Sequence, residues 1–157
     1  MGCDIHMHRE RKLPDGTWES MDEWEKNPDY DSQYDSPEDE HRMCIKNWKS
    51  LHIGRDYALF GFLSKGVRWD CECAFAQRGL PDDVTPNVKD YYDYEDCDAH
   101  STSYLNVKEI KDSLNLVKLT LLHDSPRLVD AVNSMLDHLF TEDEMNENHR
   151  IVFWFDN

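Results

Sequence analysis

Apolar and polar residues alternate strictly at the start of the chain. Between residues 2 and 9, Cys3, Ile5 and Met7 alternate with polar side chains. A period of two is typical of a strand with one face in the core and the other toward solvent. The turn-forming run Pro14-Asp15-Gly16 follows, so the strand is expected to return as a hairpin.

Three later segments have the end signals of helices. Asp56 can cap a helix that Gly66 ends, and Asn106 with Glu109 three residues on resembles a capping box. The pair Ser125-Pro126 is a strong helix start. The apolar residues that follow at helical spacing are Tyr57, Leu59, Phe60 and Leu63 in the first, Ile110, Leu114, Val117 and Leu121 in the second, and Leu128, Val132, Met135, Leu136 and Leu139 in the third.

The chain closes on an apolar run, residues 151–155, followed at once by Asp156. A short run that is apolar on both faces is typical of a central strand. Two long helices and a few separated strands predict an α+β fold. We expect a small sheet that pairs the N- and C-terminal strands, with two or three helices packed on one side.

Two acidic stretches, residues 26–42 and 82–98, are expected to be long surface loops. The 157 residues suit a single domain with a real core. No run approaches the roughly 18 apolar residues that a membrane span requires. The first residues match neither a secretory signal nor a complete myristoylation motif. The sequence therefore predicts a cytoplasmic protein with no membrane partner.

The formal charge of −16 limits the partners. Duplex nucleic acid is bound by Lys and Arg that displace counterions, and the chain has no basic stripe, so duplex binding is not expected. A small anionic ligand is compatible with this charge if metal ions or a few arginines offset the local potential. The odd number of cysteines, 5, does not indicate a disulfide framework.

The polar face of the first predicted strand holds Asp4, His6 and His8. Alternate Cα atoms of a strand lie about 6.5–7 Å apart, which lets imidazole and carboxylate groups converge on one divalent metal ion. Zn²⁺, Mn²⁺, Fe and Mg²⁺ are the candidates. Asp156 joins this group if the terminal strands are neighbours. The alternative to a metal site is that Asp4, His6 and His8 lie on a solvent-exposed strand face and that Asp156 belongs to a solvated chain end.

A second Asp-x-His pair, Asp98 and His100, offers acid–base chemistry or a second part of the metal site. Two alternatives stay open here. One is an ordinary polar loop. The other is a structural zinc site in which Cys71, Cys73 and Cys97 join His100, although the single residue between the first two is unlike the usual spacing.

Arg55 and Arg78 stand out in a chain with few cations, and each can hold a phosphate or carboxylate in a bidentate manner. Ser101, Ser103 and Tyr104 add hydroxyl groups that can orient such a ligand. An arginine of this kind more often pairs with a nearby Asp. The sequence has no Gly-rich phosphate loop, nucleophile elbow or His-Glu-x-x-His motif, so the corresponding enzyme classes have no support.

Five segments spread from end to end form a recognisable set. They read Met-Gly-Cys-Asp-Ile-His-Met-His at 1–8, Gly-Arg-Asp-Tyr-Ala-Leu-Phe at 54–60, Arg-Gly-Leu-Pro-Asp-Asp-Val at 78–84, His-Ser-Thr-Ser-Tyr-Leu at 100–105 and Arg-Ile-Val-Phe-Trp-Phe-Asp-Asn at 150–157. The set resembles a family of small phage and prophage proteins. The resemblance implies a viral context and a location in the cytoplasm of a bacterial host, but no particular chemistry. Cys71 and Cys73 fall outside the family's pattern.

These features predict a divalent-metal-dependent hydrolase of a small phosphorylated substrate, for which a cyclic-nucleotide defence signal is the best candidate. The expected roles are metal binding by Asp4, His6, His8 and Asp156, catalysis by Asp98 and His100, and substrate binding by Arg55, Arg78, Ser101, Ser103 and Tyr104. The competing hypothesis is a non-enzymatic phage protein. It would sequester a nucleotide signal, or inhibit a host protein through its acidic surface. Assembly into a homo-oligomer is left open.

Overall fold

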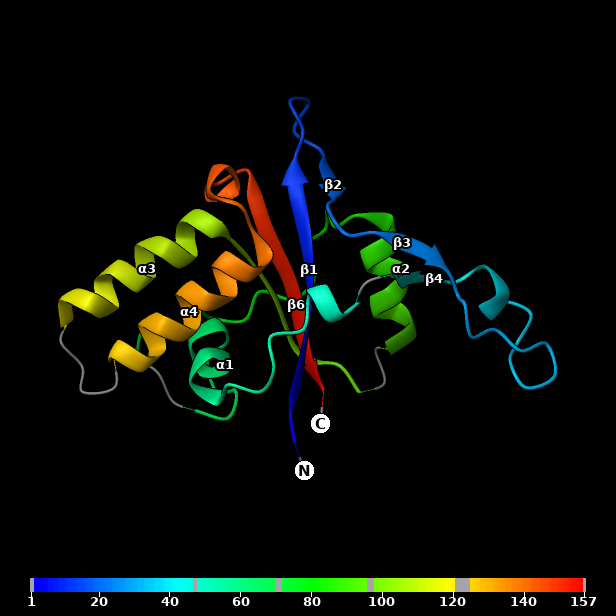
Figure 1. The fold of residues 1–157 in the computed structure, drawn as a ribbon, viewed down its shortest axis with the longest axis horizontal. Coiled ribbons are helices and arrows are strands. Elements are labelled where there is room, and N and C mark those ends of the chain that lie inside the picture. The colour runs from blue at the N-terminus through cyan, green and yellow to red at the C-terminus, as the bar shows by residue number, and fades with distance from the viewer. Residues whose placement is uncertain (1, 47, 70–71, 96–97, 121–124, 157) are drawn as a thin grey trace.

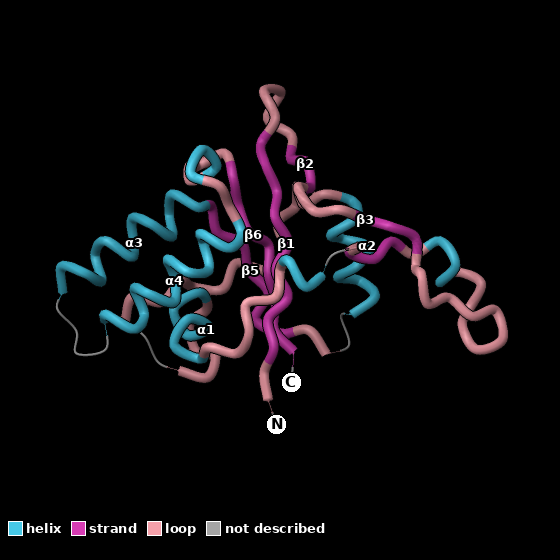
Figure 2. Tube along the Cα trace, viewed as in Figure 1, coloured by secondary structure: helices cyan, strands magenta, loops and turns pink. Residues whose placement is uncertain are grey.

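A computed structural model describes residues 2–46, 48–69, 72–95, 98–120 and 125–156. Its main sheet is antiparallel and four-stranded, in the order β2-β1-β6-β5 (Figures 1 and 2). These strands are β1 (Asp4–Lys12), β2 (Trp18–Ser20), β5 (His100–Asn106) and β6 (His149–Asp156). A second sheet has two strands, β3 (Trp24–Lys26) and β4 (Met43–Ile45).

Four helices accompany the sheets within the described residues. They are α1 (Tyr57–Leu63), α2 (Pro86–Glu95), α3 (Val107–Thr120) and α4 (Ser125–Leu139). Short 3₁₀ turns are η1 (Asp39–His41), η2 (Trp48–Ser50) and η3 (Glu142–Glu144). In the part of the chain that the structure describes, no helix is both long and apolar enough to cross a membrane.

The two terminal strands lie side by side in the middle of the main sheet (Figure 1). Their register pairs Asp4 with Asp156 and His6 with Trp154. Directly opposite residues of an antiparallel pair point to the same face, so the polar side chains of β1 share a face with Asp156. The predicted α+β class and the pairing of the two ends of the chain are confirmed.

Helices α1, α3 and α4 lie on one side of the main sheet and enclose the larger core (Figure 1). The sheet contributes Met7, Leu105, Ile151, Phe153 and Phe155 to this core, and Cys3, just before β1, joins them. The predicted caps are present: the Asp56 carboxylate accepts two backbone hydrogen bonds at the start of α1, at 3.0 and 3.1 Å. Asn106 and Glu109 form a reciprocal capping box before α3, at 2.8 and 2.9 Å. Each such cap stabilises its helix by about 1 kcal/mol.

The other face of the main sheet is covered by α2 and by β3 and β4 (Figure 2). Val88 of α2 is buried there with Val152 and Trp154 of β6. The expectation of a surface loop over residues 82–98 is therefore wrong. Pro86 occupies the first helical position, and the helix packs through a short apolar stripe. That stripe consists of Val88, Tyr91 and Tyr92.

A buried network joins β1 to β6 at the end of the sheet away from the chain termini. Arg150 Nε donates to Glu10 Oε2 at 2.7 Å, and Thr85 donates to Glu10 Oε1 from its backbone N and from Oγ1, at 2.8 and 2.7 Å. The Arg150 guanidinium also donates to Asp83 and lies 3.8 Å from the ring centroid of Trp18. Glu10 and Arg150 are both buried, so their charges depend on these partners for compensation.

Residues 26–42 extend away from the main sheet at one end of the molecule (Figure 1). All of this range is described, and after Lys26 its regular structure is limited to η1. Most of its side chains are exposed. The segment is acidic and contributes no residue to either buried cluster.

Limited proteolysis of the native protein is expected to cut first within residues 26–42. Few buried contacts oppose local opening of this segment, whereas α3 and α4 are anchored in the larger core. Mass spectrometry of the earliest fragments identifies the site. First cuts inside residues 107–120, with 26–42 intact, would contradict this prediction.

Candidate functional site

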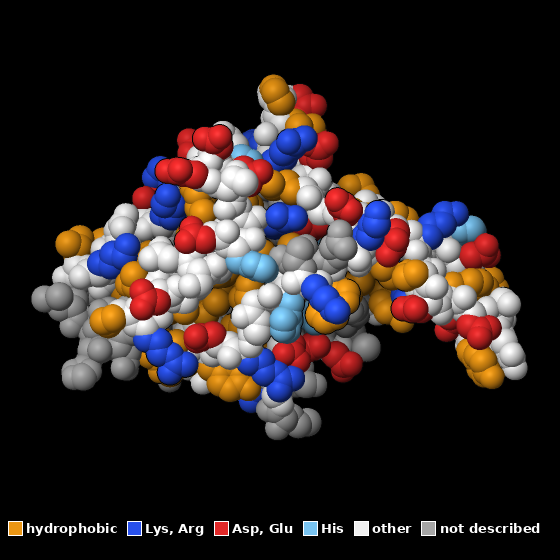
Figure 3. Space-filling model, viewed as in Figure 1, with side chains coloured by type: hydrophobic (Ala, Val, Ile, Leu, Met, Phe, Trp, Pro, Cys, Tyr) orange, Lys and Arg blue, Asp and Glu red, His pale blue; other side chains and the backbone are white. Residues whose placement is uncertain are grey.

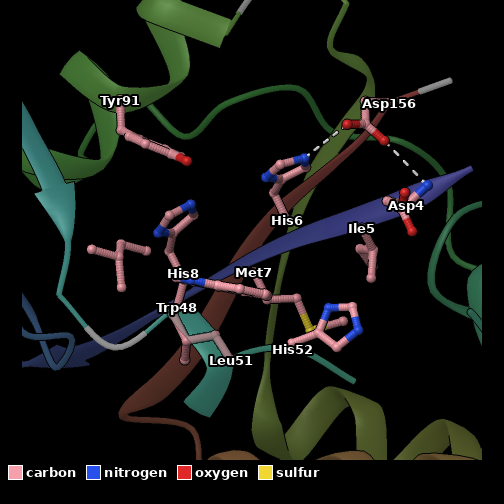
Figure 4. A pocket seen from close by; sticks show the side chains of 11 residues that line it. Asp4, Ile5, His6, Met7, His8, Trp48, Leu51, His52, Tyr91 and Asp156 are labelled. Carbon is pink, nitrogen blue, oxygen red and sulfur yellow. Dashed lines mark hydrogen bonds and ion pairs between the residues drawn. The ribbon is translucent and has the colours of Figure 1, made fainter. Parts of the chain in front are cut away.

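A cleft of about 290 Å³ lies along the N-terminal half of β1 (Figure 4). Strand β2 pairs only with residues 10–12 of β1. Among the described strands none pairs with the earlier part of that edge, which faces Ile45 and the segment 48–52. The cleft is lined by Asp4, Ile5, His6, Met7 and His8 of β1, Ile45, Trp48, Leu51 and His52 of the facing segment, Tyr91 of α2 and Asp156 of β6. Histidine side chains gather at the middle of the surface in the view of Figure 3, close to both acidic and basic groups.

A histidine–aspartate pair lies at one end of the cleft. His6 Nε2 is 3.1 Å from Asp156 Oδ2, and the backbone N–H of Asp4 donates to Asp156 Oδ1 at 3.1 Å (Figure 4). The β1–β6 register places these groups opposite each other. An ionised carboxylate only accepts, so Asp156 favours the tautomer in which His6 Nε2 carries a proton and Nδ1 is the basic nitrogen.

The neighbouring Asp4 carboxylate is held by an arginine. Arg55 donates from Nε to Asp4 Oδ1 at 2.7 Å and from Nη2 to Oδ2 at 2.6 Å. These bonds hold the pKa of Asp4 below its ordinary value. The structure thus brings Arg55 beside the predicted metal site, but both Asp4 oxygens already accept from it. Asp4 becomes a metal ligand only if Arg55 releases it.

At the other end of the cleft, His8 is enclosed by aromatic rings. It stacks between Trp24, at a centroid distance of 5.7 Å, and Trp154, at 4.7 Å, with the edge of Tyr91 at 5.5 Å. Trp154 stacks in turn on His6, at 5.7 Å. Four near-parallel rings therefore run along the shared face of β1 and β6.

The His8 side chain is only 1% exposed, and neither of its ring nitrogens has a hydrogen-bond partner among the described residues. Asp22 Oδ2 is 3.7 Å from Nδ1, too far for a hydrogen bond, and it already accepts from the backbone N–H of Arg9. Burial, helped by the charge of His6, lowers the pKa of His8 from 6.5 to about 3. The ring is therefore neutral, and its unsatisfied nitrogens cost about 1–3 kcal/mol each.

The four predicted metal ligands lie on one face but do not converge on one point. In the described part of the chain, no group of three or more His, Cys, Asp and Glu side chains is arranged to hold a metal ion. His6 and Asp156 are in contact, Asp4 is bound by Arg55, and His8 is inside the aromatic stack. The donor types suit Zn²⁺ or Mn²⁺, and a metal would require the side chains to rearrange.

His100 lies on the opposite face of the sheet from His6. Its ring stacks on Phe155 at 6.0 Å, and Phe155 packs against Phe60 of α1 at 5.2 Å. Its Nδ1 is 3.1 Å from the Ser101 hydroxyl. The structure does not bring His100 and His6 to one site, and the catalytic role expected of His100 stays a prediction.

A break in the β5 register explains this placement. The ladder shifts between His100 and Ser103, and Ser101 has a φ of 54°. Without the bulge, residues three apart would point to opposite faces, and His100 would face the cleft. Asp98, the other predicted catalytic residue, is exposed just before β5.

Arg78 and the β5 hydroxyls form a structural clamp remote from the cleft. Arg78 donates to Glu109 of α3 at 2.8 and 3.2 Å and to the Tyr104 carbonyl at 3.2 Å. The buried Ser103 hydroxyl accepts from the Arg78 backbone N–H at 3.2 Å, and the Ser101 hydroxyl accepts from Gln77 at 3.1 Å. The residues that line the cleft do not include Arg78, Ser101, Ser103 or Tyr104, and the substrate-binding role expected of these four stays a prediction.

Three aromatic or histidine residues of the cleft were not singled out in the sequence: Trp48, His52 and Tyr91. Trp48 is 58% exposed and contacts His52 edge-on at 5.8 Å. The local signal was an aromatic and a histidine four residues apart in the stretch that ends at the Gly-Arg-Asp motif. Nothing in that spacing indicates which strand they face.

The alternative zinc site cannot be compared with the structure, because Cys71 and Cys97 lie outside the described residues. Cys3, Cys44 and Cys73 are free thiols, and Cys3 is buried in the core.

Comparisons with protein-family models, curated proteins and solved structures found no match for this chain. The resemblance to phage and prophage proteins therefore stays a prediction. Functional inference rests on the cleft itself.

Proposed function

We propose that the protein is a hydrolase of a small phosphorylated substrate that binds in the cleft along β1. The observation that carries the proposal is the His6–Asp156 pair, in which a carboxylate orients an imidazole at the end of a cleft. A phosphodiester or cyclic nucleotide is the preferred substrate. A phage protein of this kind would remove nucleotide signals of host defence, and it would act in the bacterial cytoplasm.

The pair supplies acid–base chemistry. With its Nε2 proton directed at Asp156, the His6 ring accepts a proton from water at Nδ1 while the carboxylate stabilises the resulting imidazolium. The same ring then returns the proton to the leaving oxygen. Positioned acid–base groups of this kind contribute about 10²–10⁴-fold to rate.

The local charge explains why a divalent metal ion, Zn²⁺, Mn²⁺ or Mg²⁺, belongs to this proposal. Arg55 offsets Asp4, so Asp156 is the remaining carboxylate of the cleft lining, in a chain of net charge −16. An anionic substrate needs compensation there. His6 and Asp156 would hold the metal in place of their acid–base role, because a nitrogen bound to a metal cannot take up a proton. Asp4 would join them only if Arg55 released it, and His8 only if the aromatic stack opened. A bound metal would supply positive charge to the phosphate.

A specific observation favours the non-enzymatic alternative. Residues 26–42 are acidic and mostly exposed, and this segment extends away from the main sheet (Figure 1). A protein that inhibits a host partner through such a surface needs neither His6 nor a metal. The same set of variants therefore separates the two proposals.

Hydrolysis is expected to fall about 10²–10⁴-fold in His6→Gln and in Asp156→Asn, with little change in melting temperature. Both side chains are partly exposed at the sheet rim, so their loss removes little buried contact. The assay uses bis-p-nitrophenyl phosphate and a panel of cyclic mononucleotides and dinucleotides. Each is tested after chelation and after addition of Zn²⁺, Mn²⁺ or Mg²⁺.

The matched control is His149→Gln. His149 is also a partly buried histidine of the β1–β6 pair, but it pairs with Arg11 at the far end of the sheet. The His149→Gln variant should retain full activity. A wild-type protein that hydrolyses no substrate with any of the three metals would contradict the enzyme proposal and favour the inhibitor proposal.

A further inference from the structure

We propose that the inner end of the cleft binds a nucleobase, with His8 as its hydrogen-bonding residue and Trp48 as its stacking surface. This inference deepens the proposed function. It rests on the proposed function in one respect, which is that the phosphate end of the ligand is the end that reacts. It narrows the substrate class to nucleotides that present one base at a time.

The first support is the unusual state of His8. A nearby buried polar group on the same face is satisfied: Glu10 accepts from Thr85 and Arg150. His8 has both ring nitrogens without a hydrogen-bond partner in the described residues, and the adjacent Trp154 Nε1 is in the same state. Buried polar atoms are nearly always paired, so a lining residue with two unpaired nitrogens indicates a ligand that supplies the partners.

The second support is the match between the edge of the imidazole ring and the edge of a nucleobase. The two ring nitrogens of His8 lie in one plane and can meet the donors and acceptors that base edges present. The aromatic box of Trp24, Trp154 and Tyr91 holds the imidazole in place for that contact.

The third support is the exposed aromatic surface opposite His8. Trp48 lines the same cleft and is 58% exposed, whereas Leu51 of the same segment is buried. Bases stack on exposed aromatic side chains in many nucleotide and single-strand sites. Figure 4 shows Trp48 and Tyr91 on either side of His8.

The volume of the cleft limits the size of the ligand. A volume of about 290 Å³ is at the low end for small-molecule sites, so one base with its sugar and phosphate fits and a second base does not. His6 and His8 are alternate residues of one strand face, about 6.5–7 Å apart. A ligand with its base at His8 therefore presents its phosphate to His6 and Asp156.

The test is direct binding of adenosine, guanosine, cytidine and uridine, with ribose 5-phosphate as the ligand that lacks a base. Calorimetry and tryptophan fluorescence report binding without any need for turnover. At least one nucleoside should bind. His8→Phe keeps the ring volume and removes the nitrogens, and it should weaken that nucleoside about tenfold or more while leaving ribose 5-phosphate unchanged.

Trp48→Ala provides a second variant that does not alter the core, and it should also weaken the nucleoside about tenfold. Its matched control is Tyr34→Ala, which removes an exposed aromatic side chain from residues 26–42 and should have no effect. Nucleoside binding that both His8→Phe and Trp48→Ala leave intact would overturn the inference. So would the absence of binding by all four nucleosides at millimolar concentration.

The outcomes separate this inference from the proposed function. Nucleosides that bind at His8 in a protein that hydrolyses nothing support the inference and remove the enzyme. Hydrolysis of bis-p-nitrophenyl phosphate without nucleoside binding supports the enzyme and overturns the inference.

Discussion

Glu10→Gln is expected to lower the free energy of unfolding by about 3 kcal/mol, a large change for a domain of this size. The substitution keeps the shape of the side chain and removes its charge. Arg150 then stays buried at 3% exposure with Asp83 as its remaining carboxylate partner. Removing one member of a buried ion pair leaves the other charge poorly compensated, which is the costly event. Urea unfolding monitored by tryptophan fluorescence measures the change.

Glu19→Gln is a closely matched control in the same hairpin. Glu19 Oε2 also accepts from an arginine Nε at 2.7 Å, in this case that of Arg11. Those two side chains are 44% and 55% exposed, so their pair should contribute less than about 1 kcal/mol. Equal losses in the two variants would show that burial does not determine the strength of these pairs.

The elements that could be predicted from the sequence are those with strong local signals. Period-two alternation defined β1, the apolar run defined β6, and the side chains of Asp56, Asn106 and Glu109 defined two helix starts. Helix α2 was missed because its apolar stripe is short and lies among acidic residues. Its stability comes from packing on β6, which is a tertiary effect.

The candidate site divides in the same way. That Asp4, His6, His8 and Asp156 share a face follows from strand periodicity together with the neighbouring terminal strands. The placement of His100 depends on a single bulged residue, and no local pattern fixed that bulge. The partners of Arg55 and Arg78 lie 51 and 31 residues away, so only the fold determines which carboxylate each arginine finds.

The burial of His8 was the largest departure from the sequence-based picture. A polar residue on the outer face of a strand at the start of the chain is expected to be exposed to solvent. Helix α2 and strand β3 instead cover that face and bring Tyr91 and Trp24 onto the ring. The same covering that makes His8 a candidate ligand contact also makes it sensitive to acid.

Acidification from pH 7 to pH 5 is expected to destabilise the wild type more than His8→Phe. Burial lowers the pKa of His8 to about 3 in the folded protein, against an ordinary value of 6.5. Above pH 6.5 the ring is neutral in both states and has no effect. Between pH 6.5 and 3 only the unfolded state takes up the proton, so stability falls by about 1.4 kcal/mol per pH unit. At pH 5 the contribution of His8 is a loss of about 2 kcal/mol.

The difference between the two unfolding curves isolates this one group. Asp22 works in the opposite direction, because burial raises its pKa and favours the folded state as the pH falls, but it is present in both proteins. EDTA in every sample removes any metal ion that would compete with protons for the His8 ring. His149→Gln serves as a comparison: burial also lowers the pKa of that partly buried ring, so its removal should change the pH dependence in the same direction but by less than His8→Phe. Parallel curves for wild type and His8→Phe from pH 7 to 5 would mean that the folded protein protonates His8 as readily as the unfolded chain does. The charged ring would then be compensated by Asp22, whose Oδ2 lies 3.7 Å from Nδ1.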